Sequence, residues 1–562
     1  FFDNAALDLT GDNMSPTGDA WIWYTPGKSD IPDGSGSFVD NWSSALNLPV
    51  PTDPLVDITS ANQRNRYRFD PTYHDQLERL NADLVQPITR FSLVSLGSYS
   101  PDWFGGNEEL YYEAYFLNRH QTSTAATEQI FPTVVGQIRQ EDANGNIIVD
   151  GAGNPVLVNN PFNPFGHNIT PVITIDDHDQ VRSVELNHFR FVGGFRGDFP
   201  GGLSDKNWSY DLSVSYDRGV GYQSQKVLNE TNLILTTETL RLDSDGNLIC
   251  GVPVLNDIGF ISPQECVPVN FLAPSVFTST DTSSGTLSSD AERKFLFGTR
   301  TNRTVVEQAL VSAFVTGDLM ELPAGTIGVA FGLEYRRDSI NSTVDYLGAN
   351  GIIAAESPLA EGATIGSRDV KDVYGEIVIP LLSDHAMADS LVVEGALRYT
   401  DETNFGSKLT TRARVSYSPV DWVTISGSYG TSFRAANLRE SFIADQFGGI
   451  GGGSDPCAVP SDASSGGVYL PDQENRPQVV LDNCILQGAD PFSLGLSGAT
   501  TIPVVVGGTA QDLEPETSRS WVGKIQISPP VSDDVALDLS VGFFDIKIKD
   551  TIRSVSGATI LN

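Results

Sequence analysis

The stretch that best indicates the fold is LVVEGALRYT, residues 391–400. One parity of this stretch is apolar, small or aromatic: Leu391, Val393, Gly395, Leu397 and Tyr399. The other parity carries the charged residues Glu394 and Arg398. Alternation with a period of two places successive side chains on opposite faces of a β-strand. The stretch therefore predicts a strand that separates an apolar environment from a polar one.

Similar segments continue along the chain on both sides of this strand. Residues 409–417 alternate in the same way, and a short turn at 418–421 leads to a third alternating segment, 423–430. The same pattern returns at 189–196, 208–217, 327–336 and 535–543. Alternating segments that are joined by short turns indicate antiparallel hairpins, so the sequence predicts a β-meander.

Two features favour a transmembrane barrel over a soluble β-sandwich. Tyrosines lie near the ends of the alternating segments, as an interfacial aromatic girdle requires: Tyr216, Tyr335, Tyr399, Tyr417 and Tyr429. Short turns such as 322–325 and 529–532 alternate with long stretches such as 338–368 and 441–511. We therefore expect an all-β fold, a transmembrane antiparallel β-barrel with short periplasmic turns and long extracellular loops.

The composition excludes several classes of protein. The chain has 562 residues, with 71 Asp and Glu against 35 Lys and Arg, and a net charge of −36. Such an acidic balance argues against a nucleic-acid partner, because binding phosphates requires a basic surface. No stretch approaches the roughly 18–20 consecutive apolar residues of a membrane helix. Membrane strands are shorter and alternate in polarity, so a barrel stays compatible with the sequence.

The four cysteines are Cys250, Cys266, Cys457 and Cys484, and they form two pairs in stretches rich in Gly, Pro and Asp. We expect two disulfides that close loops, which places the chain in an oxidising compartment. Four free thiols are the alternative, whereas no Cys-x-x-Cys or Cys/His spacing supports a zinc site.

The sequence offers no catalytic or metal-binding motif. No Ser/His/Asp arrangement is visible, and the six histidines lack metal-ligand spacing, so we expect no enzyme, no metal and no cofactor. Residues 142–146 and 243–247 begin like calcium loops but lack the acidic residue at the twelfth position. We interpret both as turns, since Asn-Gly and Asp-Gly favour them. The acidic run 176–179 is interpreted as a solvated loop at a strand end.

Two segments in the second half of the chain resemble a known family. Residues 427–442, GSYGTSFRAANLRESF, are similar to its strand-to-loop signature, with Ala436 and Ser441 in place of the usual Pro and Leu. Residues 513–517, LEPET, precede a strand from Trp521 and the segment 543–552. In this order the segments resemble TonB-dependent outer-membrane receptors of Gram-negative bacteria, from about Arg68 to Asn562.

The resemblance implies a single barrel domain over residues 1–562. The family's N-terminal plug and its closing C-terminal strand have no counterpart in this sequence. Roughly 13–14 strands can be placed, against about 22 in a plugged transporter barrel, so we expect a partial barrel of the 22-stranded type.

The resemblance also implies a function. A receptor of this family captures a scarce nutrient (a siderophore, vitamin, oligosaccharide or similar) in the cell outer membrane and imports it into the periplasm. The implied partners are the TonB–ExbB–ExbD complex, acting through the plug, and the surrounding lipid and lipopolysaccharide. The long loops would form a vestibule, with Trp103, Phe104, Arg434 and Asn437 as candidates for ligand contact. The alternatives are a passive porin-like channel and a secreted adhesin that uses Arg196-Gly197-Asp198.

Overall fold

The computed structural model describes residues 83–553 with gaps, and short strand segments before residue 83. These segments are β1 (Ala20–Ile22), β2 (Tyr24–Pro26), β3 (Ile31–Pro32), β4 (Phe38–Val39) and β5 (Tyr67–Phe69). The gaps are 102, 126–129, 131, 133, 164–168, 172, 174–179, 200–206, 252–265, 278–285, 353–359, 452–454, 466–467, 489, 493, 495–500, 508–512 and 533–534. The acidic run 176–179 thus lies outside the described residues.

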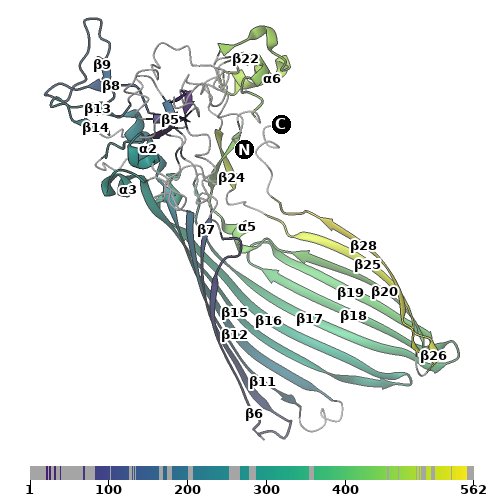
Figure 1. The fold of residues 1–562 in the computed structure, drawn as a ribbon. Helices are drawn as coiled ribbons and strands as arrows, with labels where there is room; N and C mark the ends of the chain where they lie inside the picture. The colour runs from purple at the N-terminus through teal and green to yellow at the C-terminus, as the bar shows by residue number, and fades with distance from the viewer. Residues whose placement is uncertain are drawn as a thin grey trace.

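The described chain is dominated by one curved antiparallel sheet whose twelve strands follow one another in sequence order (Figure 1). The strands are β6 (Ile88–Tyr99), β7 (Glu109–Ala125), β11 (Gln180–Asp198), β12 (Ser209–Leu228), β15 (Phe297–Leu322), β16 (Gly325–Val344), β17 (Thr364–His385), β18 (Ala388–Glu402), β19 (Gly406–Val420), β20 (Val423–Arg434), β25 (Glu516–Ile527) and β28 (Leu539–Lys549). The predicted meander and its antiparallel pairing are confirmed. The described sheet has fewer strands than predicted, and β26 (Pro530–Ser532) and β27 (Val535–Ala536) form a separate hairpin between β25 and β28.

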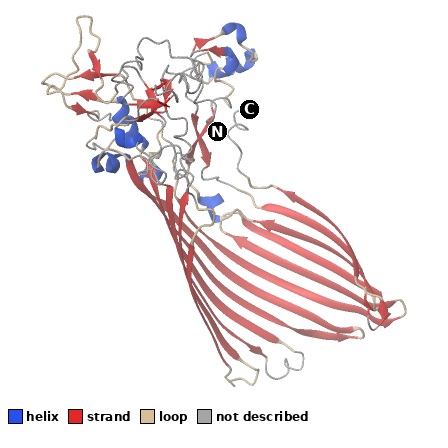
Figure 2. Ribbon diagram, in the orientation of Figure 1, coloured by secondary structure: helices blue, strands red, loops and turns tan. Residues whose placement is uncertain are grey.

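Short connections lie at one end of the sheet and long connections at the other, as predicted, except that the turn 403–405 at the end of the long connections has three residues. The tightest turns are at 323–324, 386–387 and 421–422, whereas the longest connections, 126–179, 229–296 and 435–515, leave the other end. Figure 2 shows the helices gathered at this long-connection end. Within the residues that the structure describes, no helix is both long and apolar enough to cross a membrane.

One predicted loop is shorter than expected. The sequence placed a long loop at 338–368, but β16 continues to Val344 and β17 begins at Thr364. Asp338 and Arg368 are therefore strand residues that face each other in the ladder, and Arg368 Nε lies 3.0 Å from Asp338 Oδ2. Both charged residues lie on the polar face of two long strands.

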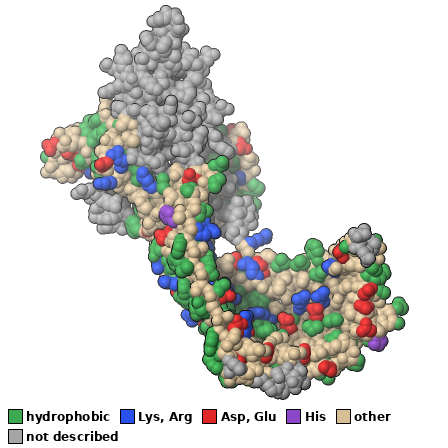
Figure 3. Space-filling view, turned by 60° about the horizontal axis from the view of Figure 1, so that its bottom comes forward, with side chains coloured by type: hydrophobic (Ala, Val, Ile, Leu, Met, Phe, Trp, Pro, Cys, Tyr) green, Lys and Arg blue, Asp and Glu red, His purple; other side chains and the backbone are tan. Residues whose placement is uncertain are grey.

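The strand register keeps the two faces of the sheet chemically distinct. Arg398 lies between Tyr374 and Thr410, and Glu394 lies opposite Arg414, so the charged positions of neighbouring strands share one face. We call this the inner face; Figure 3 shows Lys, Arg, Asp and Glu side chains gathered on the hollow of the sheet. The opposite, outer face carries apolar side chains that no described segment of the chain covers, such as Leu397, which is 57% exposed. The outer face therefore has the character of a lipid-contacting surface.

The first two long connections fold together at the end of the sheet. Strands β8 (Gln137–Gln140) and β9 (Leu157–Asn159) of the first pair with β13 (Arg241–Leu242) and β14 (Leu248–Ile249) of the second in a four-stranded sheet. Both predicted turns occur here: Asp142 Oδ1 and Asp243 Oδ1 each accept hydrogen bonds from backbone N–H groups two and four residues further on.

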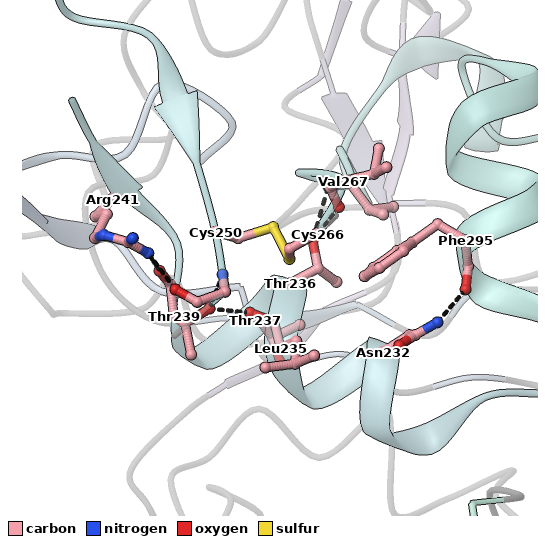
Figure 4. Close-up of a disulfide and its surroundings, with 12 residues drawn as sticks. Asn232, Leu235, Thr236, Thr237, Thr239, Arg241, Cys250, Cys266, Val267 and Phe295 are labelled. Atoms are coloured by element: carbon pink, nitrogen blue, oxygen red, sulfur yellow. Dashed lines mark hydrogen bonds between the residues drawn. A yellow bond between two sulfur atoms is a disulfide. The ribbon is translucent and has the colours of Figure 1, made fainter. Parts of the chain in front are cut away.

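Both predicted disulfides are present in the long connections. Cys250 and Cys266 are joined with their Cα atoms 5.5 Å apart, next to α2 (Glu230–Glu238) (Figure 4). Beside this disulfide, the Arg241 guanidinium donates to the carbonyl of Thr239 at 3.1 Å (Figure 4). It also donates to the carbonyl of Gly251 at 2.6 Å. The second disulfide joins Cys457 and Cys484, whose Cα atoms are 5.6 Å apart.

The second disulfide belongs to a small folded unit, residues 455–494, which we call the stapled module. Its helix α6 (Gln478–Leu486) carries Cys484, and Arg476 lies just before the helix. The Arg476 guanidinium donates to the carbonyls of Cys457 (3.0 Å) and Pro491 (2.7 Å) and to the Glu474 carboxylate (2.6 Å). The hydrogen bond from Arg476 lowers the pKa of Glu474 to about 2.

Candidate functional site

The two segments that carry the family resemblance meet in one ion cluster at the long-connection end of the sheet. Arg434, the last residue of β20, lies opposite Glu516 of β25. Its guanidinium lies 2.9 Å from Glu516 Oε1 and 3.0 Å from Glu440 Oε2. The backbone N–H of Ile552 also donates to Glu516 Oε1, at 2.8 Å. The cluster therefore joins the ends of three strands to the segment that follows Arg434.

That segment forms the short helix α5 (Leu438–Phe442), which is capped by Asn437. Asn437 Oδ1 accepts a hydrogen bond from the Glu440 N–H at 2.8 Å, and Glu440 Oε2 accepts one from the Asn437 N–H at 2.7 Å. This reciprocal arrangement is a capping box. The Phe442 ring packs on Gly366 of β17, where a Cβ atom would lie only 2.2 Å from the ring. The absence of a side chain at Gly366 thus lets α5 lie directly on the sheet.

The four predicted vestibule residues do not come together. Arg434 and Asn437 lie at the long-connection end, and both are engaged in holding α5. Trp103 and Phe104 lie in the β6–β7 connection at the opposite end, where the Trp103 ring is 6.2 Å from the Phe195 ring and the Phe104 N–H donates to Glu108. Their position gives no support to a role in a vestibule formed by the long loops.

A cavity of about 610 Å³ lies on the inner face beneath α5. The strands β11, β12, β15, β16 and β17 form its wall through side chains of the inner-face parity. Its charged lining residues are three arginines and one carboxylate: Arg182, Arg300, Arg439 and Glu361. Arg182 comes from β11 and Arg439 from α5, so elements far apart in the sequence meet around one space. We call this space the inner-face cavity.

The one carboxylate in the lining is already neutralised by a neighbour. Arg300 Nη2 lies 2.5 Å from Glu361 Oε2, and the two side chains are only 9% and 18% exposed. Asn302 Nδ2 donates to the same oxygen at 3.2 Å, whereas the buried Asn302 Oδ1 has no hydrogen-bond partner within the described residues. Arg182 and Arg439 are exposed. The lining therefore holds an excess of positive charge together with an unused hydrogen-bond acceptor.

Sequence reasoning did not find the arginines of the cavity. Arg182 has the same parity in β11 as Arg190 and Arg196, and that alternation could have placed it on the inner face. Arg439 lies two residues after Asn437 inside the recognised motif, but nothing in the motif indicates which way it points. Arg300 is the fourth residue of β15, just beyond the helix α3 (Asp290–Leu296), so no alternating segment precedes it in the sequence.

Ion pairs continue along the inner face away from the cavity. Arg398 contacts Glu334 at 2.5 Å and Asp372 at 2.9 Å, which links β16, β17 and β18. Arg414 of β19 contacts Glu394 of β18 at 3.3 Å. A strand wall with ionic pairs on one face and apolar residues on the other is the arrangement of a large membrane barrel with a polar interior.

The fold and its inner face thus define the wall of an outer-membrane-type barrel, and a family comparison agrees. Residues 141–562 match the family model described as TonB dependent receptor-like, beta-barrel. The match covers about three quarters of the chain, and the chain belongs to this family. A search of curated proteins finds no match.

Several solved structures are similar to this chain at low sequence identity. A ferric enterobactin receptor (PfeA) variant from Pseudomonas aeruginosa is 13% identical, with 82% of this chain and 43% of that chain covered and a TM-score of 0.36. The ferric-catecholate import receptor Fiu from K12 E. coli is 10% identical, with coverages of 83% and 52% and a TM-score of 0.35. The RagAB peptide importer is 8% identical, with coverages of 82% and 40% and a TM-score of 0.39. The chain spans less than half the length of the first of these structures.

Proposed function

We propose that this chain is the barrel section of an outer-membrane receptor that binds a scarce nutrient at the cell surface and imports it into the periplasm. Energy would be transduced by the TonB–ExbB–ExbD complex through a plug domain. The observation that carries the proposal is the inner-face cavity, which lies beneath α5 at the end of the sheet where the long connections gather. A solute that enters from the long loops reaches this cavity before it reaches the ion-paired wall.

Both faces of the sheet fit this location. The outer face presents apolar side chains for lipid, and its tyrosines provide an interfacial girdle. Tyr399 of this face lies toward the long-connection end and Tyr335 lies near the middle of β16, whereas Tyr417 lies near the short turns and donates to the Met387 carbonyl. Lipopolysaccharide would then surround the long-connection end, and the acidic loops would face the medium. The ion-paired inner face supplies a polar lining for a plug or for water.

Two of the predicted vestibule residues have a role in this proposal. Arg434 and Asn437 would act on the ligand indirectly, by fixing the helix that presents Arg439 to the cavity. The Arg196-Gly197-Asp198 tripeptide forms the last three residues of strand β11, where Arg196 is paired with Glu109 at 2.7 Å. This arrangement favours a receptor over an adhesin, because an adhesive tripeptide must project from a loop.

The test is transport by the full-length protein in a Gram-negative host. We expect the protein to fractionate with the outer membrane and to require detergent for extraction. Uptake of its nutrient should be lost when the host's TonB is deleted and should return when TonB is supplied. Uptake that is indifferent to TonB would identify the passive channel instead, and extraction without detergent would contradict the membrane location.

A further inference from the structure

We infer that the inner-face cavity is an oxyanion site, so that the imported solute carries carboxylate, phosphate or similar anionic oxygens that Arg182 and Arg439 bind. The inference rests on the proposed import function and adds the chemical class of the solute. Its starting point is the contrast between a chain of net charge −36 and a cavity whose lining holds three arginines and one carboxylate. In so acidic a protein, an excess of arginine around one space indicates a specific electrostatic requirement.

The cavity's own ion pair leaves two arginines available. Glu361 is occupied by Arg300 and by the Asn302 amide. Arg182 and Arg439 have no ion pair within the described part of the chain, and both face the cavity. Guanidinium groups bind carboxylate and phosphate oxygens through paired, charge-assisted hydrogen bonds. Each guanidinium group can therefore bind an anionic oxygen of a solute that occupies the cavity.

The remaining lining adds neutral hydrogen-bonding groups. Gln223 supplies an amide, and Thr304 and Ser342 supply two hydroxyls that hydrogen-bond each other at 2.7 Å. The buried Asn302 Oδ1 lacks a donor among the described residues. A hydroxyl or amide on the solute would satisfy that acceptor. The volume of about 610 Å³ lies within the range of small-molecule sites. The lining thus fits a compact, polar and anionic solute, and it lacks the apolar walls that would favour an uncharged aromatic ligand.

The geometry of α5 explains how Arg439 is held over the cavity. The capping box at Asn437 and the contact of Phe442 with Gly366 fix the helix on β17, while Arg182 comes from the inner face of β11. The two guanidinium groups therefore come from rigid and independent elements. Such preorganisation lowers the ordering cost of binding.

The experiment measures binding of a carboxylate and of its amide to the purified full-length protein. Propane-1,2,3-tricarboxylate and its triamide have nearly the same size and differ in charge, and inorganic phosphate provides a second oxyanion. Titration calorimetry is performed in a low-salt buffer that contains no competing oxyanion. We expect the tricarboxylate to bind at least tenfold more tightly than the triamide, because a hydrogen bond to a charged partner contributes about a factor of ten or more.

Three variants make the assignment specific. Arg182→Gln and Arg439→Gln should each weaken tricarboxylate binding about tenfold, and the double variant should weaken it about a hundredfold. Both side chains are exposed and unpaired within the described residues, so these changes leave the fold intact. Arg190→Gln is the matched control: it lies on the same strand and face, eight residues or roughly 26 Å away, and should leave binding unchanged.

Each outcome decides the inference. The oxyanion site would be overturned if the acid and the amide bound equally, or if no tricarboxylate binding were seen up to about 10 mM. It would also be overturned if the double variant bound as tightly as the unchanged protein, or if the Arg190 variant lost binding to the same extent. None of these binding results would contradict TonB-dependent import, which is measured separately by uptake. Conversely, anion binding that follows the two arginines would support the site even if uptake proved independent of TonB.

Discussion

Removing the disulfide between Cys457 and Cys484 should loosen the stapled module without disturbing the barrel. The cross-link spans 27 residues, and closing a loop of that size removes unfolded-state entropy worth roughly 3.5 kcal/mol at 25 °C. We therefore expect the double variant Cys457→Ala/Cys484→Ala to raise the population of the locally open module roughly 400-fold. Replacing both cysteines avoids leaving a reactive thiol.

Hydrogen exchange measured by mass spectrometry follows this opening directly. The reporter is the peptide that contains α6, residues 478–486, because its amides are protected only while the module is folded. Exchange of α6 should accelerate by about two to three orders of magnitude in the double variant. Peptides from β15 and β16, in the middle of the sheet, should exchange as before.

A matched control separates local stapling from a general effect of disulfide loss. The variant Cys250→Ala/Cys266→Ala removes a cross-link of 16 residues and should accelerate exchange around α2 while leaving α6 unchanged. An acceleration of α6 below about tenfold in the Cys457/Cys484 variant would refute the entropy argument. It would mean that the hydrogen bonds of Arg476 to the surrounding carbonyls set the stability of the module.

Three further predictions concern the barrel wall and the module. Arg398→Met leaves the carboxylate of Asp372, which is 5% exposed, without its ion pair. This variant should destabilise the protein by about 3 kcal/mol, measured by urea unfolding from lipid. Adding Asp372→Asn should recover most of the lost stability. Leu397→Arg on the outer face should cost about 2 kcal/mol or more in the same assay, while Ala396→Arg on the inner face should cost much less. Because the pKa of Glu474 is lowered from 4.5 to about 2, its stabilisation is complete above pH 5 and is lost as the pH falls toward 2. Exchange of α6, corrected for intrinsic rates, should accelerate over that range, and Glu474→Gln should lack this dependence.

The alternation of side chains was sufficient to predict the sheet. In residues 391–400 one parity is apolar and the other includes Glu394 and Arg398, and a shift of one residue would turn both charges toward lipid. Because a register shift on any strand would carry the same free-energy cost of turning charged side chains toward lipid, the alternation specifies strand position, register and inner face together. The limits of the strands were less predictable. Asp338 and Arg368 look like loop residues, but they pair with each other across β16 and β17 beyond the apolar part of the wall.

The cavity could not be predicted in the same way, because it depends on contacts between elements far apart in the chain. Arg182 and Arg439 are separated by most of the sheet in sequence, and only the curvature of the sheet and the fastening of α5 bring them to one space. Alternation assigns a side chain to a face, but it carries no information about which residues meet across that face. The disulfides were easier to predict, because the two cysteines of each pair are close in sequence and lie within one loop.

The recognised motif identified the support of the site and not its lining. Arg434 and Glu440 form the ion cluster with Glu516, and Asn437 caps the helix, so the motif residues are occupied by one another. These contacts involve only the ends of the strands and the first residues of the following connection. They can therefore form whatever solute the receptor binds. A residue that binds the solute must instead keep a hydrogen-bonding group free, and the Arg439 guanidinium has no ion pair among the residues that the structure describes. The sequence motif therefore locates the helix and ion cluster that lie next to the cavity. The groups available to bind a solute are the charged side chains around them that have no ion pair among the described residues.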